Sequence, residues 1–505
     1  MQAAPTRPTV LASTLLAAML GIAYLVWAPS SQDLAAATFR ADLFSDHGFA
    51  IWNNAWYDGH YLLSYSVLYP PLGALFGPRL TGALAVVAAA ALFALLARRR
   101  FGDRALIPSL WFAVAVSAWL LTGRIPFLFA LPIGLGALLE SDSGRPWTAT
   151  ALAAATSLAS PVAGLFVALA GAALGLTGDL RRGLALAFGA LIPIAVLNLA
   201  FPTGGFEPFV FSAWIAIPLL AAVVLWLVPS EFAALRVGAV LYALLALALF
   251  VIDNPLGGNV TRLAALFAGP VLALALWPRG LWLVLAVSIP LAYWQLVAPV
   301  RDVRKASGDR STELAFYEPL LAQLDRVDGG DPSGFRVQIP PTKNRFEAAY
   351  VARERPIARG WLRQLESEDF DLFTDGGLTA EAYRGWLDDH AVGWVAVADA
   401  PRDYLSEDEV ALIDSGLDYL DPVWTSDDWT LYRVADPVPI GADVSGPDRF
   451  EVEAEAAGEL APALNYNRYW DGEGGCVRDS DGRTVVEAKA PGRLEFGVSV
   501  SGARC

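Results

Sequence analysis

Apolar residues recur along residues 8–298 in runs long enough to cross a bilayer, and polar residues collect between them. A helix needs about 20 apolar residues to span the hydrocarbon core. The stretch 147–177 is broken at Ser160-Pro161, and proline disfavours helix at the residue before it. We therefore predict two helices there and a mainly α, polytopic membrane protein with about 11 crossings. The other predicted spans are 8–28, 73–97, 105–121, 124–140, 184–200, 210–228, 235–252, 262–277 and 280–298.

The pattern changes after residue 300, where charged residues become frequent. Residues 301–328 show apolar positions at helical spacing, and later runs alternate as strands do. We predict a transmembrane domain over 1–300 with a long first outer loop at 29–72. An α/β domain over 301–436 and a small β-rich end module over 448–505 follow it.

The arginines between the runs set the expected orientation. Arg98, Arg99, Arg100 and Arg104 form the densest basic cluster, and basic loops stay in the cytoplasm. The amino terminus is then inside. The first loop and everything after Val300 are outside, and we read the first run as a retained helix rather than a signal peptide. This predicts a multi-pass protein of the cell membrane with an extracytoplasmic carboxyl-terminal part.

Composition agrees with a membrane protein, since 55% of the 505 residues are hydrophobic and 17% are charged. Residues 301–505 hold 22 basic and 40 acidic residues, a balance that disfavours binding to nucleic acid or to anionic headgroups. Both cysteines, Cys476 and Cys505, lie in this outer part. We expect them to pair in an oxidising compartment, which would contribute roughly 3 kcal/mol; two free thiols are the alternative.

The first loop, 33–71, is far longer than a connection needs and is rich in acidic and aromatic residues. Asp33 opens a predicted helix over residues 34–44, and Asp46 lies just beyond that helix. A carboxylate at a span's outer end can accept a proton from a hydroxyl. So many exposed aromatics would be costly, which favours an interfacial belt or rings that stack on sugars. The candidate binding residues of this loop are Trp56, Tyr57, His60 and Tyr65. Aspartates that solvate a surface helix, and a structural role for His60, are the alternatives.

Two arginines open apolar runs on the same predicted outer side. Arg124 follows a Thr-Gly pair, and Arg262 ends the motif GGNVTR, which also contains Asn259. The guanidinium fork suits phosphate, and a positive helix start adds attraction for an anion. Snorkelling to the headgroups is the alternative reading. Glu207, in FPTGGFEPF, adds a carboxylate or belongs to an ordinary turn.

One outer segment, NRFEAAYVARERPIARGWLRQLE over 344–366, concentrates charge. It is interpreted as a cap on the membrane site or a grip on an acceptor glycan, with a salt-bridged surface as the alternative.

Several segments carry a family resemblance that covers most of the chain. They are GFAIWNNAWYDGHYLLSYSVLYPPLG, TGRIPF, SPVAGLF, GGNVTRLAALFAGPVLA and EAAYVARERPIARGWLRQL. These are similar to a group of multi-span bacterial membrane proteins, mainly actinobacterial. The architecture resembles the GT-C superfamily of integral membrane glycosyltransferases. That family has a catalytic Asp or Glu in a long first outer loop, often has an outer carboxyl-terminal domain, and takes sugar from a polyprenyl-phosphate donor.

The resemblance places the family's acidic residue on Asp33, with Asp46 as the alternative. Two adjacent carboxylates, present in some members, are absent here, which leaves the base and a divalent metal open; no cofactor is implied with certainty. The implied activity is transfer of a sugar to a cell-envelope glycan, lipid or protein. Asp33 would deprotonate the acceptor, and Arg124 and Arg262 would stabilise the leaving phosphate.

Two other classes stay open. A transporter or lipid flippase would place polar groups near the bilayer midplane on broken helices. The break at Ser160-Pro161 suits that class, whereas the near absence of charge within the apolar runs disfavours it. A non-catalytic envelope assembly protein that displays its tail to a partner is the third.

Overall fold

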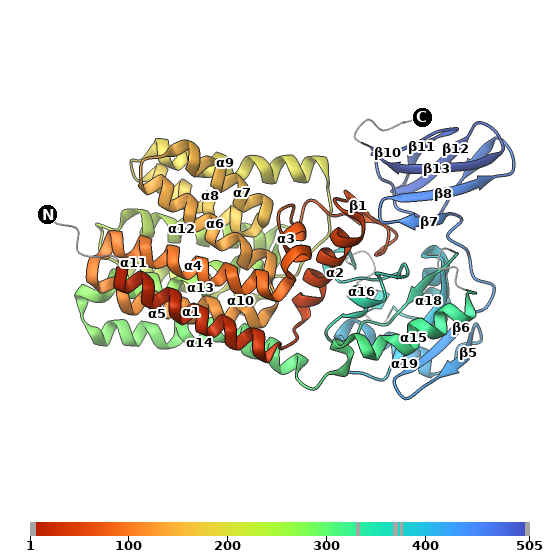
Figure 1. Cartoon of the computed structure of the whole chain (residues 1–505), viewed down its shortest axis with the longest axis horizontal. Helices are drawn as coiled ribbons and strands as arrows, with labels where there is room; N and C mark the ends of the chain where they lie inside the picture. Colours follow the sequence, from red (N-terminus) through yellow and green to blue (C-terminus); the bar gives the residue numbers. More distant parts are fainter. Residues whose placement is uncertain (1–6, 330–333, 367–371, 374–376, 500–504) are drawn as a thin grey trace. The chain divides into compact units, whose positions relative to one another are not determined.

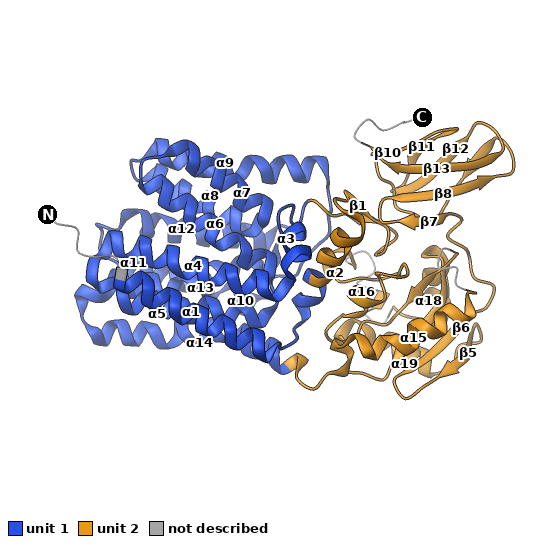
Figure 2. Ribbon diagram, viewed as in Figure 1, with its two compact units in different colours: residues 1–37, 64–304 blue, residues 38–63, 305–505 orange. Residues whose placement is uncertain are grey.

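The computed structural model describes residues 7–329, 334–366, 372–373, 377–499 and 505 (Figure 1). The chain forms two compact units (Figure 2). Unit 1 comprises residues 1–37 and 64–304, and unit 2 comprises residues 38–63 and 305–505. The sequence places the whole first loop with the membrane domain, but its central part, 38–63, folds with the residues after 304.

Unit 1 is built of helices, most of them joined by short turns and α9 and α10 by an irregular segment over 201–210 (Figure 1). The helices are α1 (Arg7–Trp27), α3 (Tyr69–Phe76), α4 (Pro78–Phe101), α5 (Leu106–Ala118), α6 (Ile125–Asp142), α7 (Pro146–Ala159), α8 (Pro161–Leu176), α9 (Leu180–Ala200), α10 (Phe211–Trp214), α11 (Ala216–Leu227), α12 (Ala233–Val251), α13 (Arg262–Leu276) and α14 (Leu281–Ala306). Helix α2 (Gln32–His47) begins in unit 1 and ends in unit 2.

Each apolar run predicted to span the membrane is helical, and the run 210–228 contains two helices, α10 and α11. Among the described residues, 7 stretches are long and apolar enough to cross a bilayer, and one of them, Pro78–Thr122, contains both α4 and α5. The break between α7 and α8 falls at Ser160, as the sequence predicts. The protein is a multi-pass membrane protein, and the number of about 11 crossings stays a prediction.

Small residues allow helices of unit 1 to approach one another closely. A Cβ at Gly183 would lie 2.6 Å from the backbone of Gly175, and one at Gly171 would lie 2.8 Å from the backbone of Ala187. Helices α8 and α9 therefore touch through their backbones, a packing that membrane helices favour because no hydrophobic effect drives them together in lipid.

The α/β part of unit 2 is a four-stranded sheet in the order β3-β4-β6-β5. The strands are β3 (Arg336–Gln338), β4 (Val392–Ala398), β5 (Leu420–Thr425) and β6 (Trp429–Val434); β3 and β4 are parallel, and the other pairs are antiparallel. Its helices are α15 (Leu314–Val327), α16 (Glu347–Tyr350), α18 (Ala380–Asp389) and α19 (Glu407–Asp414).

The prediction that residues 301–328 form a single helix is wrong. Helix α14 continues to Ala306, and α15 begins only at Leu314. Between them, Gly308 takes a φ of 75°, which favours glycine. The side chain of Asp309 then accepts a hydrogen bond from the Ser311 backbone N–H at 3.0 Å. These two residues turn the chain between the helices.

The end module consists of two antiparallel sheets, β10-β13-β8-β7 and β11-β12-β9. The strands are β7 (Asp443–Gly446), β8 (Arg449–Ala454), β9 (Gly458–Leu460), β10 (Trp470–Gly472), β11 (Gly475–Ser480), β12 (Arg483–Ala488) and β13 (Gly492–Val498). Cys476 and Cys505, which the sequence predicts to pair, form a disulfide with their Cα atoms 5.1 Å apart. The first loop adds a hairpin of β1 (Trp52–Asn53) and β2 (His60–Tyr61) to unit 2.

Candidate functional site

Asp33 and Arg124, predicted as base and phosphate ligand, meet in unit 1. The Arg124 Nε lies 3.2 Å from Oδ2 of Asp33, and its Nη2 lies 3.9 Å from Oδ2 of Asp302. The exposed fractions of the three side chains are 18%, 14% and 8%. Burial lowers the pKa of Arg124, but the charges of Asp33 and Asp302 outweigh burial, so the pKa is raised. Arg124 is therefore a permanent cation between two carboxylates.

The glycine before Arg124 explains why Asp33 and Arg124 lie close together. Gly123 has a φ of 74°, and a Cβ there would lie 2.5 Å from both the Leu34 backbone N and Ser31 Oγ. The turn before α6 can therefore press against the start of α2 only with glycine. Asp33 stands in the first turn of α2, and Arg124 directly precedes α6. The close approach of turn and helix start thus brings the two charges together.

Arg262 lies beside the same group. It is the first residue of α13, and its Nη2 donates a hydrogen bond to Oδ1 of Asn259. Its Cζ lies 5.2 Å from the ring centroid of Phe127, while Cζ of Arg124 lies 5.7 Å from the ring of Trp119. The two ring centroids are 6.3 Å apart, so the guanidiniums cover neighbouring aromatic rings, a favourable cation–π arrangement.

Tyr65 and Glu207 complete the set in unit 1. Both interact electrostatically with Arg262, and Tyr65 also interacts with Arg124. In the described part of the chain, the buried Nε of Arg262 and the buried Oδ2 of Asp302 have no hydrogen-bond partner. An unsatisfied buried donor costs about 1–3 kcal/mol, and an anion bound beside Arg262 would remove that cost.

A divalent metal does not fit these carboxylates as they lie. The negative charges of Asp33 and Asp302 face the guanidinium of Arg124, which a metal ion would have to displace. Among the described residues, the group of His, Cys, Asp and Glu atoms close enough to hold an ion is Cys476, Glu487 and Cys505, and the disulfide occupies both of its thiols.

Three of the predicted first-loop residues, Trp56, Tyr57 and His60, belong to unit 2. Trp56 is fully buried, donates from Nε1 to the Ala348 carbonyl at 3.0 Å, and stacks on Phe39 with centroids 4.2 Å apart. His60 also stacks on Trp56, with ring centroids 5.5 Å apart, and the Tyr57 hydroxyl donates to Glu366 at 3.2 Å. The expectation of an exposed aromatic surface is therefore wrong for Trp56.

His60 and Asp46 both have structural surroundings. Burial and the nearby charge of Arg40 lower the pKa of His60 to about 3, so its ring is neutral near pH 7. Asp46, the alternative base, receives two hydrogen bonds from Arg353 at 2.8 and 2.9 Å. Both belong to unit 2, whereas Asp33, Arg124 and Arg262 belong to unit 1.

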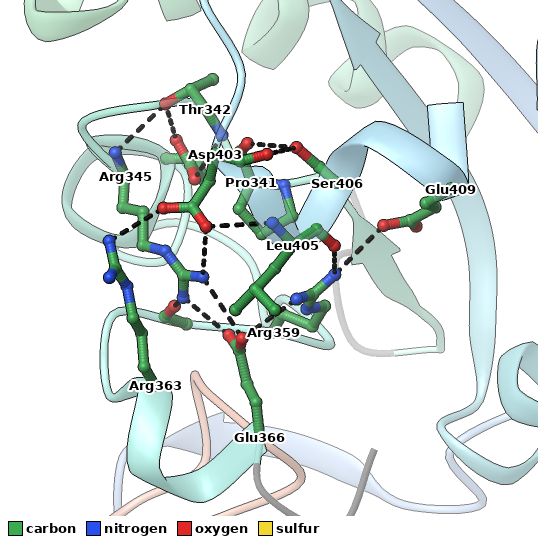
Figure 3. A network of polar contacts seen from close by, with 12 residues as sticks. Pro341, Thr342, Arg345, Arg359, Arg363, Glu366, Asp403, Leu405, Ser406 and Glu409 are labelled. Carbon is green, nitrogen blue, oxygen red and sulfur yellow. Dashed lines mark hydrogen bonds and ion pairs between the residues drawn. The ribbon is translucent and has the colours of Figure 1, made fainter. Parts of the chain in front are cut away.

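Part of the charged outer segment over 344–366 is buried, although Arg353 is 48% exposed. Figure 3 shows Arg345 and Arg359 converging on Glu366, at 2.7 and 3.0 Å. Arg359 also reaches Glu409 at 3.1 Å, and all four side chains are no more than 4% exposed. These four residues thus form an ionic core, and neither an acceptor grip nor a salt-bridged surface describes them.

Asp58 is an ion-pair centre of unit 2 whose partners the sequence does not indicate. Its Oδ2 lies 2.7 Å from His390 Nδ1 and 2.7 Å from an Arg483 Nη, and its Oδ1 lies 3.1 Å from Arg336 Nε. Burial raises the pKa of Asp58, but the charges of Arg336 and His390 outweigh burial and lower it. Asp58 therefore joins the first loop to the sheet, to α18 and to the end module.

Asp302 is the residue of the unit 1 cluster that the sequence analysis missed. It lies in the final turns of α14, beyond the apolar run, and a tail domain was expected to start there. The sequence could have indicated Asp302 by its position, since it is an acidic residue one helical turn beyond the outer end of a predicted span.

The break at Ser160 is closed by the first loop. Ser66 Oγ donates to the Ala159 carbonyl at 2.7 Å, and the backbone N–H of Val67 donates to the Leu158 carbonyl at 2.7 Å. These carbonyls, which a broken helix in a transporter would offer to an ion, are already hydrogen-bonded. The helix break at Ser160, which suited a transporter, here binds residues 66 and 67 of the first loop through its carbonyls.

Comparisons with known proteins give structural similarities only. No family model matches the chain, and no curated protein matches it. The chain is similar to ArnT from Cupriavidus metallidurans bound to undecaprenyl phosphate, with 12% identity over 80% of this chain and 93% of that one, and a TM-score of 0.39. It is also similar to the oligosaccharyltransferase of Archaeoglobus fulgidus. The apo form gives 14% identity, coverage of 77% and 69%, and a TM-score of 0.46. The form tethered to an acceptor peptide with the NVT sequon gives 12%, 85% and 75%, and 0.44.

All three TM-scores are below 0.5, so these similarities assign no role to any residue of this chain.

Proposed function

We propose that this protein is an extracytoplasmic glycosyltransferase that moves a sugar from a polyprenyl-phosphate donor to a cell-envelope acceptor. The observation that carries the proposal is the buried pair Arg124 and Arg262, set beside Asp33 and Asp302 with a donor of Arg262 unsatisfied. Two guanidiniums at helix starts suit a phosphate. A carboxylate next to them suits a proton acceptor.

The donor phosphate would bind to Arg262 and share Arg124 with the carboxylates. Asp33 would take the proton of an acceptor hydroxyl as the oxygen attacks the anomeric carbon from the face opposite the phosphate. The bond between that carbon and the phosphate oxygen breaks, and its electron pair leaves with the polyprenyl phosphate. The centre is inverted, the proton rests on the carboxyl, and the arginines stabilise the charge that develops on the leaving group.

Asp302 is the second candidate for the base because its Oδ2 has no hydrogen-bond partner among the described residues. The two aspartates differ in their partners. Asp33 accepts a hydrogen bond from Arg124, whereas Asp302 accepts one from Arg301. Replacing each by asparagine separates their roles.

The test uses membranes that contain the full chain, supplied with radiolabelled polyprenyl-phosphate pentoses and hexoses. Asp33→Asn should lower sugar transfer by ~10²–10⁴ because it removes a general base. Binding of polyprenyl phosphate should survive. Arg262→Ala should weaken both binding and transfer. Asp46→Asn is the matched control, because it removes the same charge from an ion pair within unit 2.

If Asp302→Asn abolishes transfer and Asp33→Asn does not, the base is Asp302 and the class stands. If the wild-type protein transfers no sugar from any donor, and instead moves intact lipid across liposomes, the proposal fails and the transporter class is correct.

A further inference from the structure

Helices α7 and α9 leave an apolar groove beside the line where they touch. A Cβ at Gly189 would lie 2.8 Å from the Thr150 carbonyl, and Thr150 Oγ1 donates to the Ala185 carbonyl at 3.1 Å. Next to this contact lies a cavity of about 490 Å³, within the range of small-molecule sites. Its walls are mostly aliphatic and aromatic, and they include Trp147, Ala154, Leu184, Phe188 and Ile192.

The groove has the length of one acyl chain. Its lining runs along α9 from Arg181 to Pro193, and 12 residues of α-helix span about 18 Å at a rise of 1.5 Å each. One leaflet is about half of a 30 Å hydrocarbon core. The groove therefore reaches from the surface of one leaflet roughly to the midplane.

The residues at the Arg181 end of the groove suit a lipid headgroup. Nearby arginines are ion-paired, Arg182 with Asp179 at 3.1 Å and Arg145 with Glu140 at 3.1 Å. Within the described residues, Arg181 has no hydrogen-bond or ion-pair partner. Trp147, at the same end, is 84% exposed, as aromatic residues at a membrane interface are.

We propose that this groove binds an anionic phospholipid. One acyl chain lies between α7 and α9, and the headgroup phosphate pairs with Arg181. The bound lipid covers apolar surface of both helices at the place where they meet. The orientation predicted from the arginines puts this site in the cytoplasmic leaflet, on the side opposite the proposed reaction. The proposal is therefore independent of that reaction.

The test is native mass spectrometry of the full chain in detergent, titrated with dioleoylphosphatidylglycerol or with dioleoylphosphatidylcholine. The wild type should retain the anionic lipid preferentially. Arg181→Ala should weaken its retention about fivefold, the effect of one basic residue at a membrane surface. Arg182→Ala is the matched control, because it removes the same charge one residue away from a side chain that pairs with Asp179.

Lipids with short and long acyl chains test the groove itself without altering the protein. Dihexanoylphosphatidylglycerol carries the same headgroup but cannot fill the groove, and it should bind more weakly than the dioleoyl lipid. Ala154→Phe, which fills the groove, should reduce retention of the dioleoyl lipid. Equal loss in Arg181→Ala and Arg182→Ala, equal binding of the two dioleoyl lipids, or equal binding of the short and long chains would each overturn the proposal.

Discussion

Removing the charge of Glu366 should destabilise unit 2 more than any surface ion pair does. The side chain is 4% exposed and is bound to Arg345 at 2.7 and 3.2 Å, to Arg359 at 3.0 Å and to Tyr57 at 3.2 Å. Burial raises the pKa of Glu366, but the two arginines outweigh burial and lower it to about 2. The carboxylate is therefore charged at every ordinary pH.

Glu366→Gln keeps the size of the side chain and leaves two buried guanidiniums short of one negative charge. Breaking a buried ion pair by removing one partner costs about 3–5 kcal/mol. Each arginine keeps a second carboxylate, Asp403 for Arg345 and Glu409 for Arg359, so we expect the lower part of that range. For a domain of this size, 1 kcal/mol shifts Tm by about 2–4 °C, and the expected loss is on the order of 10 °C.

Tryptophan fluorescence of the full chain measures this transition, because Trp56 and Trp429 are buried in unit 2. Asp46→Asn is the control: its partner Arg353 is 48% exposed, and an exposed pair contributes less than about 1 kcal/mol. If Glu366→Gln lowers Tm no more than Asp46→Asn does, the network does not stabilise unit 2 as argued.

Three further predictions concern other parts of the molecule. The buried ring of His60 has a pKa of about 3 against 6.5 in the unfolded chain. Its contribution to stability is therefore complete above about pH 6.5 and falls by up to about 1.4 kcal/mol per pH unit towards pH 3. His60→Phe should make the denaturation midpoint depend less on pH between these values. An unchanged dependence on pH would contradict the burial of a neutral His60 ring. Replacing Cys476 and Cys505 by serine should lower the stability of the end module by roughly 3 kcal/mol, seen as faster proteolysis there; equal protection contradicts it. In that cysteine-free chain, Thr177→Cys should be labelled by an impermeant thiol reagent only in opened cells, and Ser415→Cys in intact cells; the reverse result overturns the orientation.

The helices and the main charges of unit 1 were predictable because their signals are local. An apolar run of span length forms a helix wherever it lies, and Pro161 ends a helix regardless of its neighbours. Arg124 and Arg262 were recognised because each stands at the start of such a run. The sequence also indicated Asp33, the first carboxylate after the first run.

Only the tertiary structure decided which of these charges meet. Arg124 and Asp33 are 91 residues apart, and their contact depends on the backbone approach at Gly123, which no local pattern encodes. Asp302 joins them from the far end of the membrane part. It can do so because α14 continues past its apolar run to Ala306.

The first loop shows the limit most plainly. Its composition identifies an unusual segment, but composition cannot say which face of an aromatic ring will be covered. Burial depends on what packs against a side chain, and the partners of Trp56 and Asp58 lie about 300 to 400 residues further along the chain. The sequence alone therefore determined that this loop is unusually long and rich in acidic and aromatic residues. Long-range packing decided that the centre of the loop is buried in unit 2 and that Asp33, at its edge, lies beside the arginines.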